Sequence, residues 1–112
     1  MFARFVREIY GDACYKGFYD KAFEVQESQS GINQVHARNA FTCQMLLGVV
    51  AEVSEAYEAL REGNLVKYEE EVTDAIIRLF SLCGYSKINL DATIPKKLAK
   101  NRQRPRLHKK IF

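Results

Sequence analysis

One pattern of ten residues occurs twice, and it constrains the fold of this chain more than any other feature. Residues 51–60 and residues 70–79 carry acidic and apolar residues at matching positions, nineteen residues apart. In both copies the apolar residues recur at the three- and four-residue spacing of one helix face. Gly63 and Asn64, residues typical of a helix end and a helix start, separate the copies. The sequence therefore predicts two consecutive amphipathic helices joined by a short turn.

The apolar faces of these two helices predict how they pack. A helix pair joined by a short turn is antiparallel. We therefore expect a central antiparallel hairpin with one apolar stripe from each helix in its seam. One stripe consists of Leu46, Val49, Val53, Tyr57 and Leu60, and the other of Val72, Ala75, Ile76, Leu79 and Cys83.

Each copy also holds two acidic residues three positions apart, Glu52 with Glu55 and Glu71 with Asp74. Residues at this spacing are neighbours on a helix surface, and both pairs stand at the same angle to their stripe. Antiparallel packing would bring the four carboxylates together at one edge of the seam. Such charges repel one another unless a cation neutralises them, and oxygen ligands suit Mg²⁺ or Mn²⁺. The other acids of the two helices are interpreted as surface charge: Glu58, Glu62, Glu69 and Glu70.

The remaining periodicity and turn residues indicate an all-α chain. Helices are predicted over residues 2–15, 32–61, 65 to 82 or 83, and from after Asn89 to 102. Residues 21–31 are polar and poorly periodic, which predicts a loop that has room for one helical turn. We expect a single domain, residues 1–112, with four helices and a basic C-terminal segment, residues 96–112.

Composition argues against several other classes of protein. Cys14, Cys43 and Cys83 are widely spaced and odd in number, which favours reduced core thiols in a cytoplasmic protein over a disulfide framework. The two histidines are too scattered for a zinc site. The sequence shows no signal peptide and no apolar run of about eighteen residues, so we expect no membrane partner.

Charge is distributed unevenly along the chain. Residues 1–91 carry nine Lys and Arg against fourteen acids, a net charge of −5, whereas residues 92–112 carry eight basic residues and no acid, a net charge of +8. A basic tail is typical of a solvated segment or of one that attracts nucleic acid. A helical module that binds nucleic acid through this tail is therefore the alternative to a metal-dependent enzyme.

Three blocks of sequence, in order, resemble the MazG-like all-α nucleoside triphosphate pyrophosphohydrolases. The two acid pairs, with fifteen residues between them, match the family's Glu-x-x-Glu and Glu-x-x-Asp motifs. Residues 16–20, Lys-Gly-Phe-Tyr-Asp, are similar to a Lys-Gly-Phe-Trp-Asp segment of relatives. Residues 97–108 are similar to their closing Lys-x-x-x-Asn-x-x-Arg-Pro-x-x-His. The resemblance covers nearly the whole chain and implies a four-helix MazG-like bundle.

The resemblance also implies an activity, which is Mg²⁺-dependent hydrolysis of a nucleoside triphosphate to the monophosphate and pyrophosphate in nucleotide-pool house-cleaning. One carboxylate would accept the proton of the water that attacks the α-phosphorus. Lys97 would take part in catalysis and face the triphosphate together with Asn101, and Arg78 is a further phosphate-binding candidate. For Arg104, phosphate contact, subunit contact and an exposed tail stay open. The residues that the resemblance assigns to the metal and to catalysis are Glu52, Glu55, Glu71 and Asp74.

Four residues are candidates for contacts to the base. Aromatic rings stack on any nucleobase, which suggests Phe18 and Tyr19, and His36 and Asn39 would supply polar neighbours. The alternative for these residues is core or interface packing, and for His36 an exposed helix position. The preferred base and sugar stay open, so ribonucleotides, deoxyribonucleotides and noncanonical nucleotides are all candidate substrates.

Two further features qualify the resemblance. Tyr19 replaces a common Trp of the family, Ser81 stands where relatives often carry Asp, and Lys109 follows His108 where Gly is usual. None of these positions belongs to the four carboxylates. Relatives associate as dimers or pairs of dimers, so a homodimer or homotetramer is expected. Apolar residues that one hairpin would leave uncovered agree with this: Phe41, Met45, Leu47 and Val50.

Overall fold

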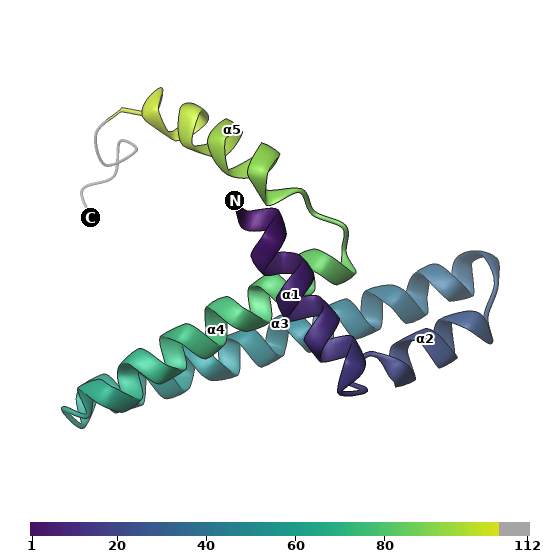
Figure 1. Ribbon diagram of the computed structural model, residues 1–112, viewed down its shortest axis with the longest axis horizontal. Coiled ribbons are helices and arrows are strands. Elements are labelled where there is room, and N and C mark those ends of the chain that lie inside the picture. Colours follow the sequence, from purple (N-terminus) through teal and green to yellow (C-terminus); the bar gives the residue numbers. More distant parts are fainter. Residues whose placement is uncertain (106–112) are drawn as a thin grey trace.

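The computed structural model of this protein describes residues 1–105, and these residues form five α-helices and no strand (Figure 1). The all-α class is confirmed, with five helices where four were predicted. His108, Lys109 and the rest of residues 106–112 lie outside the described part of the chain. The helices are α1 (Phe2–Tyr15), α2 (Asp20–Glu27), α3 (Gly31–Arg61), α4 (Leu65–Tyr85) and α5 (Leu90–Arg102).

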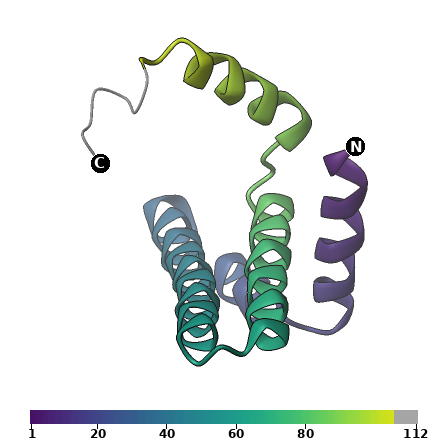
Figure 2. The ribbon, with the colours of Figure 1, turned by 90° about the vertical axis from the view of Figure 1, so that its left-hand side faces the viewer.

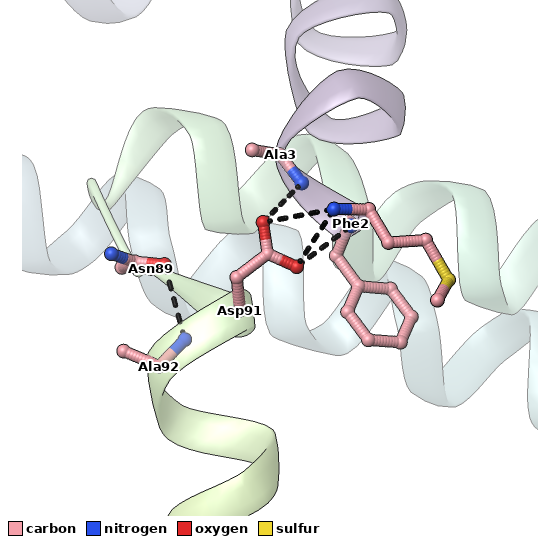
Figure 3. A network of polar contacts seen from close by, with 6 residues as sticks. Phe2, Ala3, Asn89, Asp91 and Ala92 are labelled. Carbon is pink, nitrogen blue, oxygen red and sulfur yellow. Dashed lines mark hydrogen bonds and ion pairs between the residues drawn. The ribbon is translucent and has the colours of Figure 1, made fainter.

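Helices α3 and α4 form the predicted antiparallel hairpin, which is the longest feature of the molecule (Figure 1). Gly63 has a positive φ of 72°, a conformation that glycine adopts without a steric cost. The side chain of Asn64 accepts a hydrogen bond from the backbone N–H of Lys67 at 3.1 Å and so caps α4. Asn89 caps α5 in the same way through the N–H of Ala92 at 3.2 Å (Figure 3). The turn residues read from the sequence are therefore confirmed.

The prediction of a loop over residues 21–31 was wrong, because α2 occupies residues 20–27 of this segment. Its sequence has weak helical periodicity, so packing has to stabilise it. Ala22 is buried and belongs to the same core cluster as Tyr19 and Tyr85. This contact, invisible in the local sequence, explains why a mostly polar segment is helical.

The core of the molecule is an aromatic cluster where α1, α2, α3 and α4 meet. The rings of Tyr19 and Tyr85 are stacked with their centroids 5.2 Å apart. Tyr10 approaches Tyr19 edge-on at 4.9 Å and Phe41 does so at 5.8 Å. Phe41 and Met45 therefore pack against the core, contrary to the expectation that one chain leaves them uncovered. Leu47 and Val50 are exposed as expected.

The seam between α3 and α4 is formed by small residues, of which only Ala75 belongs to a predicted stripe. Ala56, Ala59 and Ala75 are buried there, whereas Val53 and Tyr57 are more than half exposed. At about 100° per residue, the seam is rotated roughly 60° from its predicted position, toward the acid pairs. The physical reason is that alanine lets two helices approach closely, and the bulkier stripe residues are left outside.

This rotation leaves one side of the hairpin apolar and uncovered, on the other side of the seam from the acid pairs. We call this surface the exposed apolar face. Its residues are Leu46, Val50, Val53, Tyr57 and Leu60 of α3 and Ile76 and Leu79 of α4.

Helix α5 is attached to the rest of the molecule through the start of α1 (Figure 3). The carboxylate of Asp91 accepts hydrogen bonds from the backbone N–H groups of Phe2 at 2.9 Å and Ala3 at 3.1 Å. These bonds lower the pKa of Asp91 because they favour its charged form. From this point α5 extends away from the hairpin (Figures 1 and 2).

Two predictions from composition can be compared with the fold. The three cysteines are free thiols, but Cys43 is exposed, so its assignment to the core was wrong. None of the five described helices has both the length and the apolar character needed to cross a membrane.

Candidate functional site

Three of the four predicted carboxylates converge between α3 and α4. Glu52, Glu55 and Glu71 each offer an oxygen within 4.8 Å of the others, and we call this group the carboxylate cluster. The rotated seam explains the arrangement, because it turns the inner acid of each helix toward the partner helix. The side chain of Glu52 is only 15% exposed as a result.

Hydrogen bonding within the cluster changes its protonation. The hydrogen bond to Glu52, burial and the neighbouring Glu55 raise the pKa of Glu71 to about 7. The same bond to Glu71, assisted by Arg78, lowers the pKa of Glu52 against the effect of burial. Because the two shifts run in opposite directions, Glu71 is the member of this pair that takes up a proton more readily. A carboxyl group keeps its proton more readily when other carboxylates crowd it, so the raised pKa marks a place where negative charge is concentrated. A cation could relieve the same repulsion.

Asp74 and Arg78 stand beside the cluster on α4. The Nε of Arg78 donates a hydrogen bond to a carboxylate oxygen of Glu52 at 2.9 Å, which pairs the two helices electrostatically. Asp74 is exposed and is not part of the three-carboxylate group, but it lines the same cavity as Glu52 and Arg78. The predicted convergence therefore includes three of the four acids, and Asp74 lies beside them on the cavity wall.

A cavity of about 670 Å³ adjoins the carboxylate cluster. Helix α1, the connection from α1 to α2, α3 and α4 all contribute to its wall. This volume lies in the range typical of small-molecule sites. Both charges occur on the wall, with Asp12, Glu52 and Asp74 as acids and Lys16 and Arg78 as bases. The cavity therefore presents carboxylates and cationic side chains within one hollow.

The two aromatic candidates for base stacking differ in their positions. Phe18 lines the cavity and is 71% exposed, so its ring is available to a ligand. Tyr19 is only 2% exposed, because Tyr85 stacks on it and Tyr10 and Phe41 approach edge-on. Tyr19 has no free ring face, and the expected stacking role does not fit it. Tyr19 forms the floor of the cavity, which agrees with the alternative prediction that it packs in the core.

The hydroxyl of Tyr19 forms a buried hydrogen bond with Ser81 at 2.6 Å. These are two of the three positions at which the sequence departs from the family that it resembles. Burial raises the pKa of Tyr19, so the hydroxyl keeps its proton and can donate it to Ser81. The residues at these two positions are thus partners in one buried contact.

The remaining candidates lie away from this cavity. His36 and Asn39 are exposed on the first half of α3, which matches the alternative of an exposed position for His36. Lys97, Asn101 and Arg104 lie on or directly after α5, which packs on α1 and points away from the hairpin (Figure 2). Within one chain the structure therefore does not bring these five residues to the carboxylate cluster.

Sequence reasoning missed several residues of the cavity wall. Asp12 and Gln44 belong to it, and so does Lys16, which had been noted only as part of a motif. Gln44 stands two helical turns before Glu52, a spacing that places both on a similar side of α3. Asp12 carries no such signal, since its position follows from the way α1 crosses α4.

Comparisons of the chain with models of known protein families, with curated proteins and with solved structures gave no match.

Proposed function

We propose that this protein is a Mg²⁺-dependent nucleoside triphosphate pyrophosphohydrolase. The observation that carries the proposal is the convergence of Glu52, Glu55 and Glu71 at the edge of a cavity large enough for a nucleotide. The resemblance of the acid pairs to the MazG-like motifs supports the same activity. Mg²⁺ is the proposed cation and Mn²⁺ an alternative, because the donors are carboxylate oxygens.

The residues of the site suit hydrolysis of a phosphoanhydride. When bound, a divalent cation would neutralise phosphate charge and polarise the bond that breaks. Phosphoryl transfer depends mainly on positioning and charge stabilisation, so no serine or cysteine nucleophile is needed. A carboxylate on the wall can accept the proton of the attacking water, and Phe18 can pack on the base. Lys16 and Arg78 supply positive charge on the same wall.

The activity is tested by measuring pyrophosphate release from a panel of canonical and modified ribo- and deoxyribonucleoside triphosphates with Mg²⁺. We expect release from at least one member of the panel and none when a chelator is in excess. Absence of pyrophosphate across the panel, or release that persists in excess chelator, would contradict the proposal.

Mg²⁺ affinity should depend on pH through Glu71. A carboxyl group has to be deprotonated to bind a metal, and the pKa of Glu71 is about 7, so below this pH the cation must displace a proton. The affinity should therefore fall about tenfold from pH 8 to pH 6. The stability of the metal-free fold should change with pH in the opposite direction to Mg²⁺ affinity. Because the pKa of Glu71 is raised, the group contributes stability below its unfolded pKa of 4.5, and this contribution is lost as the pH rises to about 7. Isothermal titration of wild type and Glu71→Gln at both pH values measures this difference. Glu70→Gln is the control, and an unchanged pH dependence in Glu71→Gln would refute the assignment.

We also propose that a second copy of the chain covers the exposed apolar face. An exposed apolar surface that continues from one helix to the next is typical of an interface. In a Tyr57→Glu variant the new charge would lie in the contact, so the molar mass in solution should fall to that of the monomer. Val66→Glu places the same charge on a well-exposed residue of α4 outside this face and should keep the wild-type mass. A monomeric wild type would exclude the assembly.

Association would also give α5 a role at the site. Because α5 packs on α1 and contributes no residue to the wall of its own cavity, we propose that Lys97 and Asn101 serve the carboxylate cluster of a neighbouring copy. A monomeric Tyr57→Glu protein should then lose pyrophosphate release and still bind Mn²⁺. Full activity in the monomer would show that α5 is not needed in this way.

A further inference from the structure

Gly48 lies in the middle of α3, one turn before Glu52, at a position where glycine destabilises a helix relative to alanine. Its backbone does not require glycine, because it is absent from the residues with positive φ. The space beside it is instead taken up by a neighbour. A Cβ added at Gly48 would lie 3.0 Å from Nη1 and 3.8 Å from Cζ of Arg78. The missing side chain therefore leaves the space in which the guanidinium lies.

From this space Arg78 pairs with Glu52, a carboxylate that is also part of the proposed cation site. Its Nε donates to Glu52 at 2.9 Å, and Glu52 is also a member of the carboxylate cluster. The side chain of Arg78 is 54% exposed and lines the cavity, so it can turn to an anion there. A divalent cation at the cluster would compete with Arg78 for the same carboxylate.

We propose that Arg78 exchanges partners as the site fills, from Glu52 to a phosphate group in the cavity, and that Gly48 is the positioning residue that leaves room for this movement. The identity of the anion as a triphosphate rests on the proposed function. The planar guanidinium suits both partners, because it donates two parallel hydrogen bonds to a carboxylate or a phosphate. Cation and phosphate then favour each other's binding, since the cation releases the group that holds the phosphate.

The competing explanation is that the pair only holds α3 against α4. Half-exposed ion pairs contribute little to stability, which makes this role weak. The two explanations differ in a measurable way. An exchanged arginine opposes the binding of the cation, so its removal should strengthen cation binding while it weakens phosphate binding. If the pair of Arg78 with Glu52 were purely structural, its loss would change the cation affinity and the phosphate affinity in the same direction, or would leave both unchanged.

The experiment is a titration of the full chain with Mn²⁺, followed by electron paramagnetic resonance, with far-ultraviolet circular dichroism to establish folding. Arg78→Gln should bind Mn²⁺ about three- to fivefold more tightly than wild type, the range expected for release of a partly exposed ion pair. Arg61→Gln is the matched control. It removes an arginine from the exposed pair with Glu58 on α3 and should leave Mn²⁺ affinity unchanged. Unchanged or weaker Mn²⁺ binding in folded Arg78→Gln would overturn the proposal.

Gly48→Ala gives an independent readout. Its Cβ would crowd the guanidinium, so Mn²⁺ affinity should rise as in Arg78→Gln, though less, while the melting temperature rises because alanine favours the helix. In both variants KM for the triphosphate should rise, about tenfold in Arg78→Gln, with a smaller change in kcat. A lower KM would overturn the exchange. If wild type hydrolyses no triphosphate, the proposed function fails, and the Mn²⁺ titrations still decide whether Arg78 opposes the cation.

Discussion

The Glu55→Ala variant is expected to lose the proposed pyrophosphate release by at least about a hundredfold, because it removes one of the three carboxylates of the proposed cation site. The loss should come without unfolding, since Glu55 is exposed and acts on Glu71 through one hydrogen bond and through its charge. Steady-state kinetics on the best substrate of the panel measure the effect. Weaker Mn²⁺ binding by the same variant would connect the loss to the metal.

The matched control for Glu55→Ala is Glu58→Ala, one turn further along the same helix. Glu58 is exposed and pairs with Arg61, and it lies outside the carboxylate cluster. Its removal subtracts the same charge from α3 and should change kcat/KM by less than about twofold, as is usual for a surface substitution. Equal losses in the two variants would mean that net acidity, and not the cluster, supports the activity. Full activity in Glu55→Ala would remove the basis of the proposed function.

Local signals predicted the helices well and their packing less well. The spacing of apolar residues and the residues Gly63, Asn64 and Asn89 gave the hairpin and the start of α5, since these signals act within one turn of the chain. They cannot report which side of a helix its partner will cover. Ala56 and Ala59 are buried at the seam because closely packed helices exclude larger side chains, and the acid pairs are turned inward with them.

The site was predictable to the extent that it depends on one hairpin. The positions of Glu52, Glu55 and Glu71 follow from helix phase and antiparallel pairing, so the sequence predicted their convergence. The cavity wall also depends on how α1 crosses α4, and no local pattern contains that information. The role expected for Tyr19 failed for a related reason, because the aromatic neighbours that bury it come from α1, α3 and α4.

The crossing of α1 over α4 depends on a glycine, and its replacement should cause the largest loss of stability. A Cβ added at Gly84 would lie 2.5 Å from both Cβ and Cγ of Tyr10. Those atoms are next to the backbone of α1, so no side-chain rotation relieves the clash and the helix itself has to shift. Overpacking of this kind lowers the free energy of unfolding by about 1–3 kcal/mol, and we expect a value in the upper part of this range because the backbone has to move. We expect Gly84→Ala to lower the free energy of unfolding by at least about 2 kcal/mol, measured by urea denaturation.

Gly11→Ala separates this clash from the intrinsic preferences of glycine. Gly11 lies inside α1, and an added Cβ there meets no atom within 4 Å. Alanine at this position should therefore stabilise the fold by roughly 0.5–1 kcal/mol through helix propensity alone. The opposite signs of the two substitutions would show that Tyr10 is packed directly on the backbone of α4. Because α1 contributes Asp12 to the cavity wall, a folded Gly84→Ala protein should also have a higher KM, whereas Gly11→Ala should keep the wild-type value. A Gly84→Ala protein as stable as Gly11→Ala would contradict this crossing and with it the shape of the cavity.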